Sequence, residues 1–135
     1  MENILNAVNA VKNGSDTFVF AKSVSPMIST VDIGRSGAAC LVASDVNEHH
    51  GKHYEMSGPD YLTGDDISKV LSKKLNREIK YAELPEAAFA RMPGAVSQFF
   101  EYMSEFGKDA APKTDDVLRL TGRETSIDEF LATQF

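Results

Sequence analysis

This sequence of 135 residues has little cysteine, no long apolar run and no clustered basic residues. Cys40 is its single cysteine, so a disulfide within the chain is excluded, and a buried thiol in an apolar helical run is favoured over a nucleophile. No apolar run reaches the roughly 18 residues of a membrane-spanning helix, and the N-terminus lacks the pattern of a secretory signal. We therefore expect a cytoplasmic protein with no membrane partner.

The charge distribution argues against nucleic-acid binding. The net charge is −6, and the lysines and arginines form no stripe that could follow a phosphate backbone. The hydrophobic share of 42% and the charged share of 25% are those of an ordinary globular protein. A chain of this length fits one domain with a core of its own, so we expect a single domain over residues 1–135.

Apolar spacing and helix-end signals predict a mostly helical chain. The spacing of Thr63 with Asp66, and of Ser126 with Glu129, is typical of capping boxes that open helices. Asn76 stands where a left-handed helix terminator is wanted. The predicted helices cover residues 2–13, 33–44, 63–75, 85–91, 94–106 and 115–120, and a last one follows Ser126.

Four short runs predict β-strands: residues 17–20, 28–31, 53–56 and 79–84. A parallel sheet made only of these would have unprotected edges. Either further strands come from elsewhere, or the fold is mostly helical with a small sheet. The expected fold class is α/β, or α+β as an isolated piece, with about four short strands.

A glycine pair after one strand-like run partly matches the fingerprint that binds dinucleotide phosphates. Gly34 and Gly37 carry this match, but Asp32 stands where the first glycine is needed, and its carboxylate would repel a pyrophosphate. We favour a helix that Asp32 caps, in which the small residues allow close packing.

The remaining polar clusters have simple structural interpretations. His49, His50 and His53 are accompanied by no cysteine and no second histidine cluster, so a polar loop is favoured over a metal site, and we expect no metal. The pairs at 65–66 and 115–116 are aspartates that suit helix N-termini, where the macrodipole favours negative charge.

Six segments, taken in order, resemble one family. Residues 30–34 look like its Asp-Ile strand-to-helix junction, and residues 51–59 look like its last core strand with a Gly-Pro turn. Residues 75–81 look like a turn into a substrate-domain strand, with Asn76 where the family usually has glycine. Together with residues 1–5, 62–67 and 121–130, they make the chain resemble the C-terminal part of NmrA-like proteins, an atypical short-chain dehydrogenase/reductase group with an NAD(P)-binding Rossmann core.

The resemblance implies a larger protein. The family's glycine-rich phosphate loop and first strands find no match here, so we expect a truncated chain that consists of the C-terminal substrate-binding part. NADP or NAD is implied for the full-length protein, and we expect none to be bound by this chain alone. At the exit from the core, Met1 and Asn3 are implied as nicotinamide-side neighbours. Phe99, Phe100 and Met103 have the spacing of core residues, and the resemblance also places them at the substrate pocket.

The resemblance assigns no catalytic residue. None of the four tyrosines has lysine four positions later, the proton-donor pair of the usual short-chain dehydrogenases, and many NmrA-like proteins also lack it. The chain is then the substrate-side portion of an NAD(P)-dependent oxidoreductase for a small carbonyl or quinone. The alternatives are a non-catalytic NADP(H)-sensing regulator that binds protein partners, and a small α+β interaction domain. Truncation also predicts that Ile4, Val8 and residues 38–42 are exposed or covered by self-association.

Overall fold

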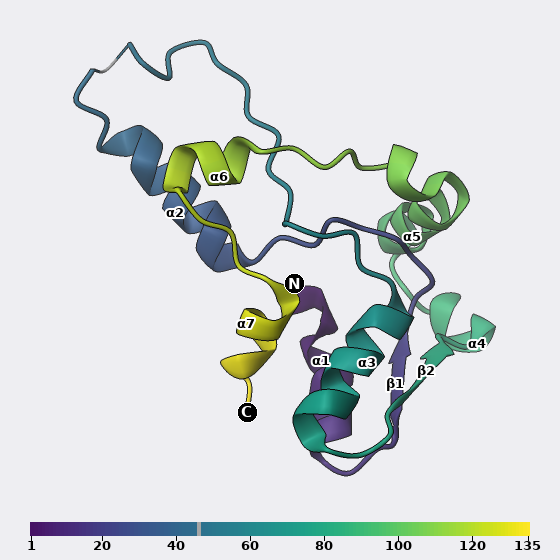
Figure 1. Ribbon diagram of the computed structural model, residues 1–135. Helices are drawn as coiled ribbons and strands as arrows, with labels where there is room; N and C mark the ends of the chain where they lie inside the picture. The colour runs from purple at the N-terminus through teal and green to yellow at the C-terminus, as the bar shows by residue number, and fades with distance from the viewer. Residues whose placement is uncertain (46) are drawn as a thin grey trace.

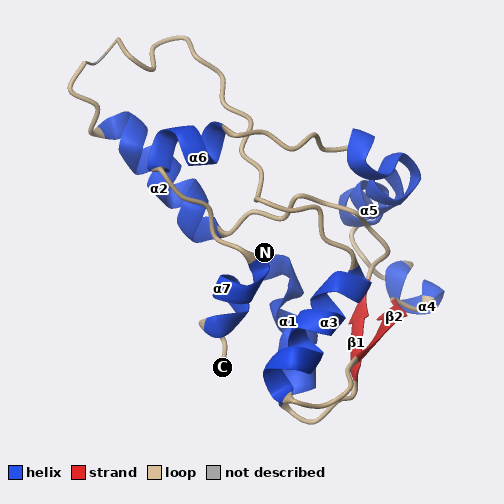
Figure 2. Cartoon of the chain, viewed as in Figure 1, coloured by secondary structure: helices blue, strands red, loops and turns tan. Residues whose placement is uncertain are grey.

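The computed structural model describes residues 1–45 and 47–135, and Figure 1 traces the chain through them. Helices dominate, and the described residues contain one two-stranded sheet, as Figure 2 shows. Each helix in this part of the chain is too short or too polar to span a bilayer. In chain order the elements are η1 (Glu2–Ile4), α1 (Leu5–Lys12), β1 (Thr17–Phe20), α2 (Thr30–Leu41), α3 (Gly64–Leu75), β2 (Lys80–Glu83), α4 (Glu86–Phe89), α5 (Gly94–Phe106), η2 (Gly107–Asp109), α6 (Asp116–Thr121) and α7 (Ile127–Ala132).

The two strands run parallel, with Thr17 aligned to Lys80 and Phe20 aligned to Glu83. Parallel neighbours need a crossover connection, and here the long stretch that contains α2 and α3 supplies it. Helices α1 and α3 pack on the sheet, and α7 packs on α3. The core lies between these elements and includes the buried side chains of Ile4, Val8, Val11, Phe18, Ile67, Leu71, Ile127, Phe130 and Leu131.

The local helix-end signals are confirmed. Thr63 and Asp66 form both hydrogen bonds of a capping box at the start of α3, and Ser126 and Glu129 do the same for α7. Asn76 ends α3 in the left-handed conformation, with φ 49° and ψ 39°. These interactions join residues only a few positions apart, which explains why their spacing alone predicts them.

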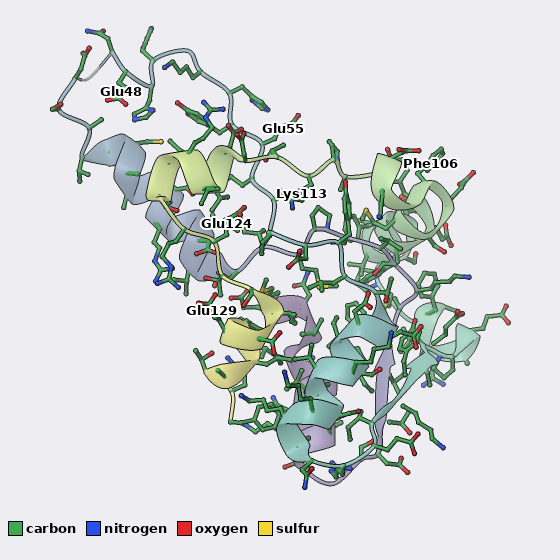
Figure 3. The ribbon with its side chains drawn as sticks, viewed as in Figure 1. Glu48, Glu55, Phe106, Lys113, Glu124 and Glu129 are labelled. Carbon is green, nitrogen blue, oxygen red and sulfur yellow. The ribbon has the colours of Figure 1, made fainter. Side chains whose placement is uncertain are left out.

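The prediction of about four strands is wrong, because two of the four runs form no strand in the described structure. Residues 17–20 and 79–84 contain β1 and β2, whereas residues 28–31 lead into α2 and residues 53–56 pair with no strand. The backbone N–H of Glu55 donates instead to the Asp116 carboxylate at 2.9 Å. Glu55 and Lys113 lie on two neighbouring connections (Figure 3). A run of strand-forming residues becomes a strand only where a partner backbone is present.

Helix α2 begins three residues earlier than predicted, and Asp32 does not cap it. The cap is Ser29, whose Oγ accepts from the Asp32 backbone N–H at 3.1 Å. The buried face of α2 carries Asp32 and Ser36. A Cβ built at Gly34 or Gly37 would meet nothing within 4 Å in the described structure, so the close packing expected at these glycines is wrong. They lie on the open side of the helix.

The faces predicted to be exposed fall into two groups. Ile4 and Val8 are fully buried in the core, contrary to the prediction, because α1 has the sheet and α3 to pack on. At the far end of α2, Leu41 is 87% exposed and Val42 is 79% exposed, as predicted. Figure 1 shows this end, with α6 beside it, reaching away from the sheet. Self-association through this end stays a prediction.

Candidate functional site

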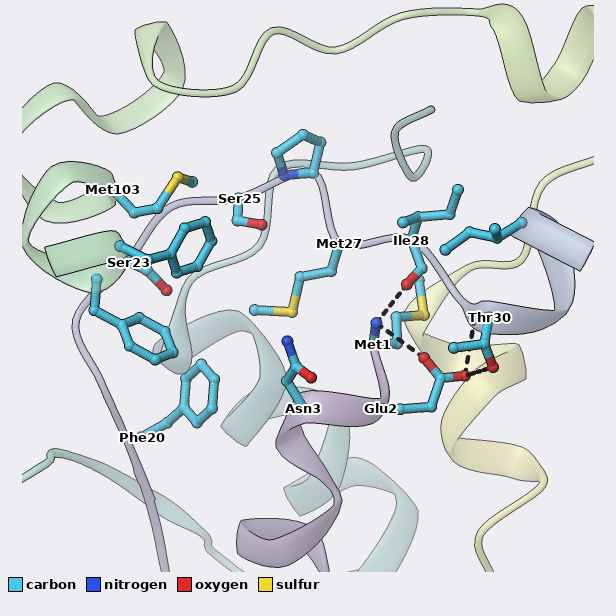
Figure 4. A pocket seen from close by; sticks show the side chains of 14 residues that line it. Met1, Glu2, Asn3, Phe20, Ser23, Ser25, Met27, Ile28, Thr30 and Met103 are labelled. Atoms are coloured by element: carbon cyan, nitrogen blue, oxygen red, sulfur yellow. Dashed lines mark hydrogen bonds and ion pairs between the residues drawn. The ribbon is translucent and has the colours of Figure 1, made fainter. Parts of the chain in front are cut away.

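A cavity of about 310 Å³ opens at the carboxyl end of β1 (Figure 4). In α/β folds, ligands bind beyond the carboxyl ends of parallel strands. Four parts of the chain build the wall: the start of η1, the end of β1 with residues 21–29 that follow it, the first turn of α2, and α5. We call residues 21–29 the exit segment. The lining residues are Met1, Glu2, Asn3, Phe20, Ser23, Ser25, Pro26, Met27, Ile28, Thr30, Ile33, Phe99, Phe100 and Met103.

Met1 and Asn3, the two residues predicted on the nicotinamide side, both line this cavity. Helix α1 precedes β1 and packs along it, so the start of α1 comes to lie beside the end of β1. The amino group of Met1 donates to the Ile28 carbonyl. The Asn3 side chain points towards Met27 across the cavity (Figure 4). Their contact with a cofactor stays a prediction.

Helix α5 supplies an aromatic wall. Phe99, Phe100 and Met103, predicted at a substrate pocket, all line the cavity. The Phe100 ring stands edge-on to Phe20, with ring centroids 5.7 Å apart, and meets Phe99 at 5.4 Å. Met103 is also buried, so it packs in the interior and lines the cavity at once. The five residues singled out from the sequence thus surround one space, and their roles towards a ligand stay predictions.

Glu2 closes the cavity beside the first turn of α2. Its Oε1 accepts from the Thr30 backbone N–H at 3.0 Å and from Thr30 Oγ1 at 2.7 Å. Partial burial acts to raise the pKa of Glu2, but the hydrogen bonds from Thr30 outweigh it and hold that pKa below its ordinary value. The first N–H groups of α2 therefore already face a carboxylate and the Ser29 hydroxyl.

The start of α2 does not fit a dinucleotide phosphate. Helix N-termini bind phosphates through free N–H groups and a glycine-rich turn. In α2 these N–H groups are taken by Glu2 and Ser29, and Gly34 lies inside the helix rather than at its entry. The partial phosphate-binding match at Gly34 and Gly37 is therefore not supported by the geometry of α2.

A second cavity of about 890 Å³ shares a wall with the first. Asn3, Phe20, Phe99 and Phe100 line both spaces, so the Asn3 amide is accessible from either side. The second cavity continues along the exposed side of β1 at Val19. Both spaces lie at the carboxyl end of β1, where Phe20 lines each of them.

The exit segment carries site residues that the sequence analysis missed. Ser23, Ser25 and Met27 line the cavity, although no motif marks them. The backbone of Ser25 forms an antiparallel bridge with Leu62. Alternation of two serines directly after an apolar strand is the signal that could have found them, because alternate residues of an extended chain share a face.

The other polar clusters do not line this cavity. His49 Nδ1 lies 2.8 Å from the Tyr54 hydroxyl, and neither residue belongs to the cavity wall. Nowhere in residues 1–45 and 47–135 do three His, Cys, Asp or Glu side chains gather as metal ligands. Asp65 and Asp66 occupy the first turn of α3, and Asp116 that of α6, as the macrodipole argument predicts.

Comparison with known proteins relates the chain to one family. The model of the NmrA-like family matches residues 11–131. Agroclavine dehydrogenase of Claviceps fusiformis is 34% identical over 108 residues, which cover 73% of this chain and 36% of that protein. Agroclavine dehydrogenase of Claviceps purpurea is 29% identical over 106 residues, with coverage of 72% and 36%. The chain therefore spans about a third of the length of these relatives.

Two solved structures share the fold. The NADPH-dependent quinone oxidoreductase of Escherichia coli superposes with a TM-score of 0.75 at 22% identity, over 99% of this chain and 51% of that one. The triphenylmethane reductase of Citrobacter sp., in complex with NADP(H), gives a TM-score of 0.77 at 15% identity, over 100% and 50%. The described fold corresponds to about half of each of these chains.

Proposed function

The chain belongs to the NmrA-like family, and we propose that it forms the substrate-side portion of an NAD(P)-dependent oxidoreductase that acts on a small carbonyl compound or quinone. The relatives named above are dehydrogenases, a quinone oxidoreductase and a reductase, and two solved structures are complexes with NADPH or NADP(H). In this proposal the cofactor is NADP or NAD, held mainly by residues outside these 135. The chain alone is then a binding unit rather than a catalyst.

One observation carries the proposal. A single cavity brings together the residues predicted from the family resemblance: Met1 and Asn3 on one side, and Phe99, Phe100 and Met103 on the other. The cavity lies at the carboxyl end of two parallel strands, where α/β folds place their ligands. The start of η1 and helix α5 are far apart in sequence, so a shared cavity is a property of the folded chain.

The chemistry of the wall suits a flat, mostly apolar ligand. Phe20, Phe99 and Phe100 present aromatic rings, and Met27 and Met103 add polarizable sulfur. The only ionisable side chain in the wall is that of Glu2, which Thr30 already holds. The chain would therefore bind and orient the substrate and exclude water, while the reduced nicotinamide supplies the hydride when bound.

Ligand binding to the 135-residue chain tests this function. Duroquinone is a suitable probe, because its four methyl groups block addition of the Cys40 thiol. We expect saturation-transfer NMR to detect duroquinone binding, and Phe100→Ala to weaken it several-fold by removing part of the apolar wall. NADPH, followed by its nicotinamide fluorescence, should bind no more tightly than millimolar. Ala132→Ser, at the exposed end of α7, is the control and should leave duroquinone binding unchanged.

Two results would overturn the proposal. Micromolar NADPH binding by these residues would show that the cofactor site lies within them. A complete lack of duroquinone binding would remove the substrate-side role. Neither depends on turnover, so the outcome does not rest on the rest of an enzyme being present.

A regulator that binds protein partners is the second candidate. The exposed end of α2 favours it, because Leu41 and Val42 present neighbouring apolar side chains to solvent. Leu41→Ser with Val42→Ser would then abolish capture of a partner while leaving duroquinone binding intact. If the chain is instead a portion of an oxidoreductase, Phe100→Ala should weaken duroquinone binding, and the substitution of Leu41 should not affect the protein's function.

A further inference from the structure

We propose that Ser23 and Ser25 bind an oxygen atom of the ligand in the cavity, and that Ser23 selects a carbonyl or hydroxyl compound over a hydrocarbon of the same shape. This inference rests on the proposed function, since it concerns the same cavity. It assigns a polar contact to an exit segment that neither the motifs nor the family resemblance marks.

Ser23 differs from most other buried serines of the molecule. Ser29, Ser57 and Ser68 each have a hydrogen-bonded hydroxyl: Ser29 Oγ accepts from Asp32 N–H, Ser57 Oγ donates to the Thr114 carbonyl, and Ser68 Oγ donates to the Asp65 carbonyl. Ser23 is only 7% exposed as a residue, and its hydroxyl bonds to no other described residue. Its Oγ is not among the fully buried unpaired atoms, so it opens to the cavity, where a ligand oxygen can bond to it in place of water.

Ser23 lies where its hydroxyl can reach a bound ligand. Ser36 differs, because its hydroxyl is fully buried without a partner in the described structure, on the inner face of α2 and away from this cavity. Ser23 lines the cavity directly (Figure 4). Ser25, two residues on, lines it too, and its hydroxyl likewise bonds to no described residue. The two hydroxyls therefore form a short polar strip on an otherwise apolar wall.

The backbone around this strip is held in place before any ligand arrives. Ser25 exchanges two backbone hydrogen bonds with Leu62, of 3.2 and 2.9 Å. The Gly58 N–H donates to the Pro26 carbonyl at 2.8 Å, and a Cβ at Gly58 would lie 2.0 Å from the Met27 carbonyl oxygen. This close approach fixes the exit segment against the 57–62 connection. A pre-formed strip loses little entropy on binding.

The neighbours of the strip define the ligand chemistry. Phe20, Phe100 and Met103 face the same cavity and suit an uncharged ring system. A serine hydroxyl donates to a carbonyl oxygen or accepts from a hydroxyl, so the strip serves both the oxidised and the reduced form of such a ligand. The Asn3 amide lies across the cavity and can hold a second oxygen. The expected ligand is a neutral planar ring compound that carries one or two carbonyl or hydroxyl oxygens on the ring.

Duroquinone and durene make a matched pair of probes, because durene has the same four methyl groups and no oxygen. We expect Ser23→Ala to weaken duroquinone binding to the 135-residue chain about tenfold, measured by saturation-transfer NMR, and to leave durene binding unchanged. Ser25→Ala should weaken duroquinone binding about threefold to tenfold with the same selectivity. Ser44→Ala, at an exposed serine beyond α2, is the control and should alter neither probe.

Three outcomes would overturn the inference. Equal weakening of both probes would show that Ser23→Ala disturbs the wall rather than removing a hydrogen bond. Unchanged duroquinone binding in both Ser23→Ala and Ser25→Ala would show that the hydroxyls do not contact the ligand; in this case the proposed function survives. If neither probe binds to the wild-type chain, both proposals fail. Circular dichroism of each variant ensures that a folded protein is compared.

Discussion

Asp32 and Thr125 lie 93 residues apart in sequence and are joined by two hydrogen bonds. The Thr125 backbone N–H donates to Asp32 Oδ2 at 2.7 Å, and Thr125 Oγ1 donates to Asp32 Oδ1 at 2.9 Å. Arg35 adds an ion pair at 3.1 Å from the same helix. Asp32 is 1% exposed, so these contacts replace the hydrogen bonds that its carboxylate would otherwise make to water. They also tie the start of α2 to the segment that enters α7.

Removing this carboxylate should destabilise the fold. Asp32→Ala leaves the Thr125 N–H without its acceptor, so we expect the free energy of unfolding to fall by about 2–3 kcal/mol, measured by urea denaturation. Asp60→Ala is the matched control, because Asp60 is exposed, and its effect should stay within about 0.5 kcal/mol. Equal losses of unfolding free energy in the two variants would show that the hydrogen bonds between Asp32 and Thr125 do not stabilise the fold.

The capping box of α3 predicts a pH dependence. Hydrogen bonds from the Thr63 side chain and backbone hold the pKa of Asp66 below its ordinary value. The unfolded chain therefore binds this proton more readily, so stability rises with pH between the lowered pKa and about 4. The contribution is present above about pH 4 and is lost as the pH falls through the folded-state pKa.

Thr63→Ala tests that contribution. The free energy of unfolding should fall by about 1 kcal/mol at about pH 7. The difference from wild type should shrink as the pH is lowered below about 4, because protonated Asp66 no longer favours the box. Denaturation midpoints at several pH values measure this. A constant difference across that range would mean that the Asp66 carboxylate is not involved.

The left-handed residue after α3 offers a change that increases stability. Asn76 has a positive φ, which glycine adopts without the strain of a Cβ. Asn76→Gly should raise the free energy of unfolding by about 0.5 kcal/mol, and Asn76→Ala should lower it by about 1 kcal/mol. Asn13, which ends α1 at φ −83°, is the control, since glycine gains nothing there. A gain at both positions would point to a general effect of glycine.

Two glycines should respond to alanine in opposite directions. At Gly58 a Cβ would clash with the backbone of Met27, so Gly58→Ala should lower stability by about 1–3 kcal/mol and weaken duroquinone binding by displacing the cavity wall. At Gly34 the space is open and the residue lies inside α2, so Gly34→Ala should raise stability by about 0.5–1 kcal/mol. Thermal unfolding followed by circular dichroism measures both, and matching signs would contradict this assignment.

Local sequence signals predict the helices well and the strands poorly. The capping boxes at Thr63 and Ser126 and the terminator at Asn76 depend on residues within one turn, so their spacing predicts them. The run at residues 53–56 has strand-forming residues, but no partner strand pairs with it in the described structure. Strand formation depends on a partner that the local sequence does not specify.

The candidate site shows the same division. Sequence reasoning singled out Met1, Asn3 and three residues of α5, because a family pattern marks those segments. It did not find Ser23 and Ser25, since neither belongs to a motif. The role proposed for them rests on the burial of Ser23, on two hydroxyls that bond to no described residue, and on their place in the same cavity wall as Phe20 and Phe100.

The sequence by itself determined the mostly helical character, the capped starts of α3 and α7 and the family, because these depend on short-range spacing and on the order of segments. The tertiary structure alone decided that the start of η1 and α5 share a cavity, and that the buried Asp32 carboxylate binds Thr125 rather than capping α2. Contacts between residues far apart in sequence form only when the chain has closed its core. No local pattern encodes which buried hydroxyl is left facing a cavity.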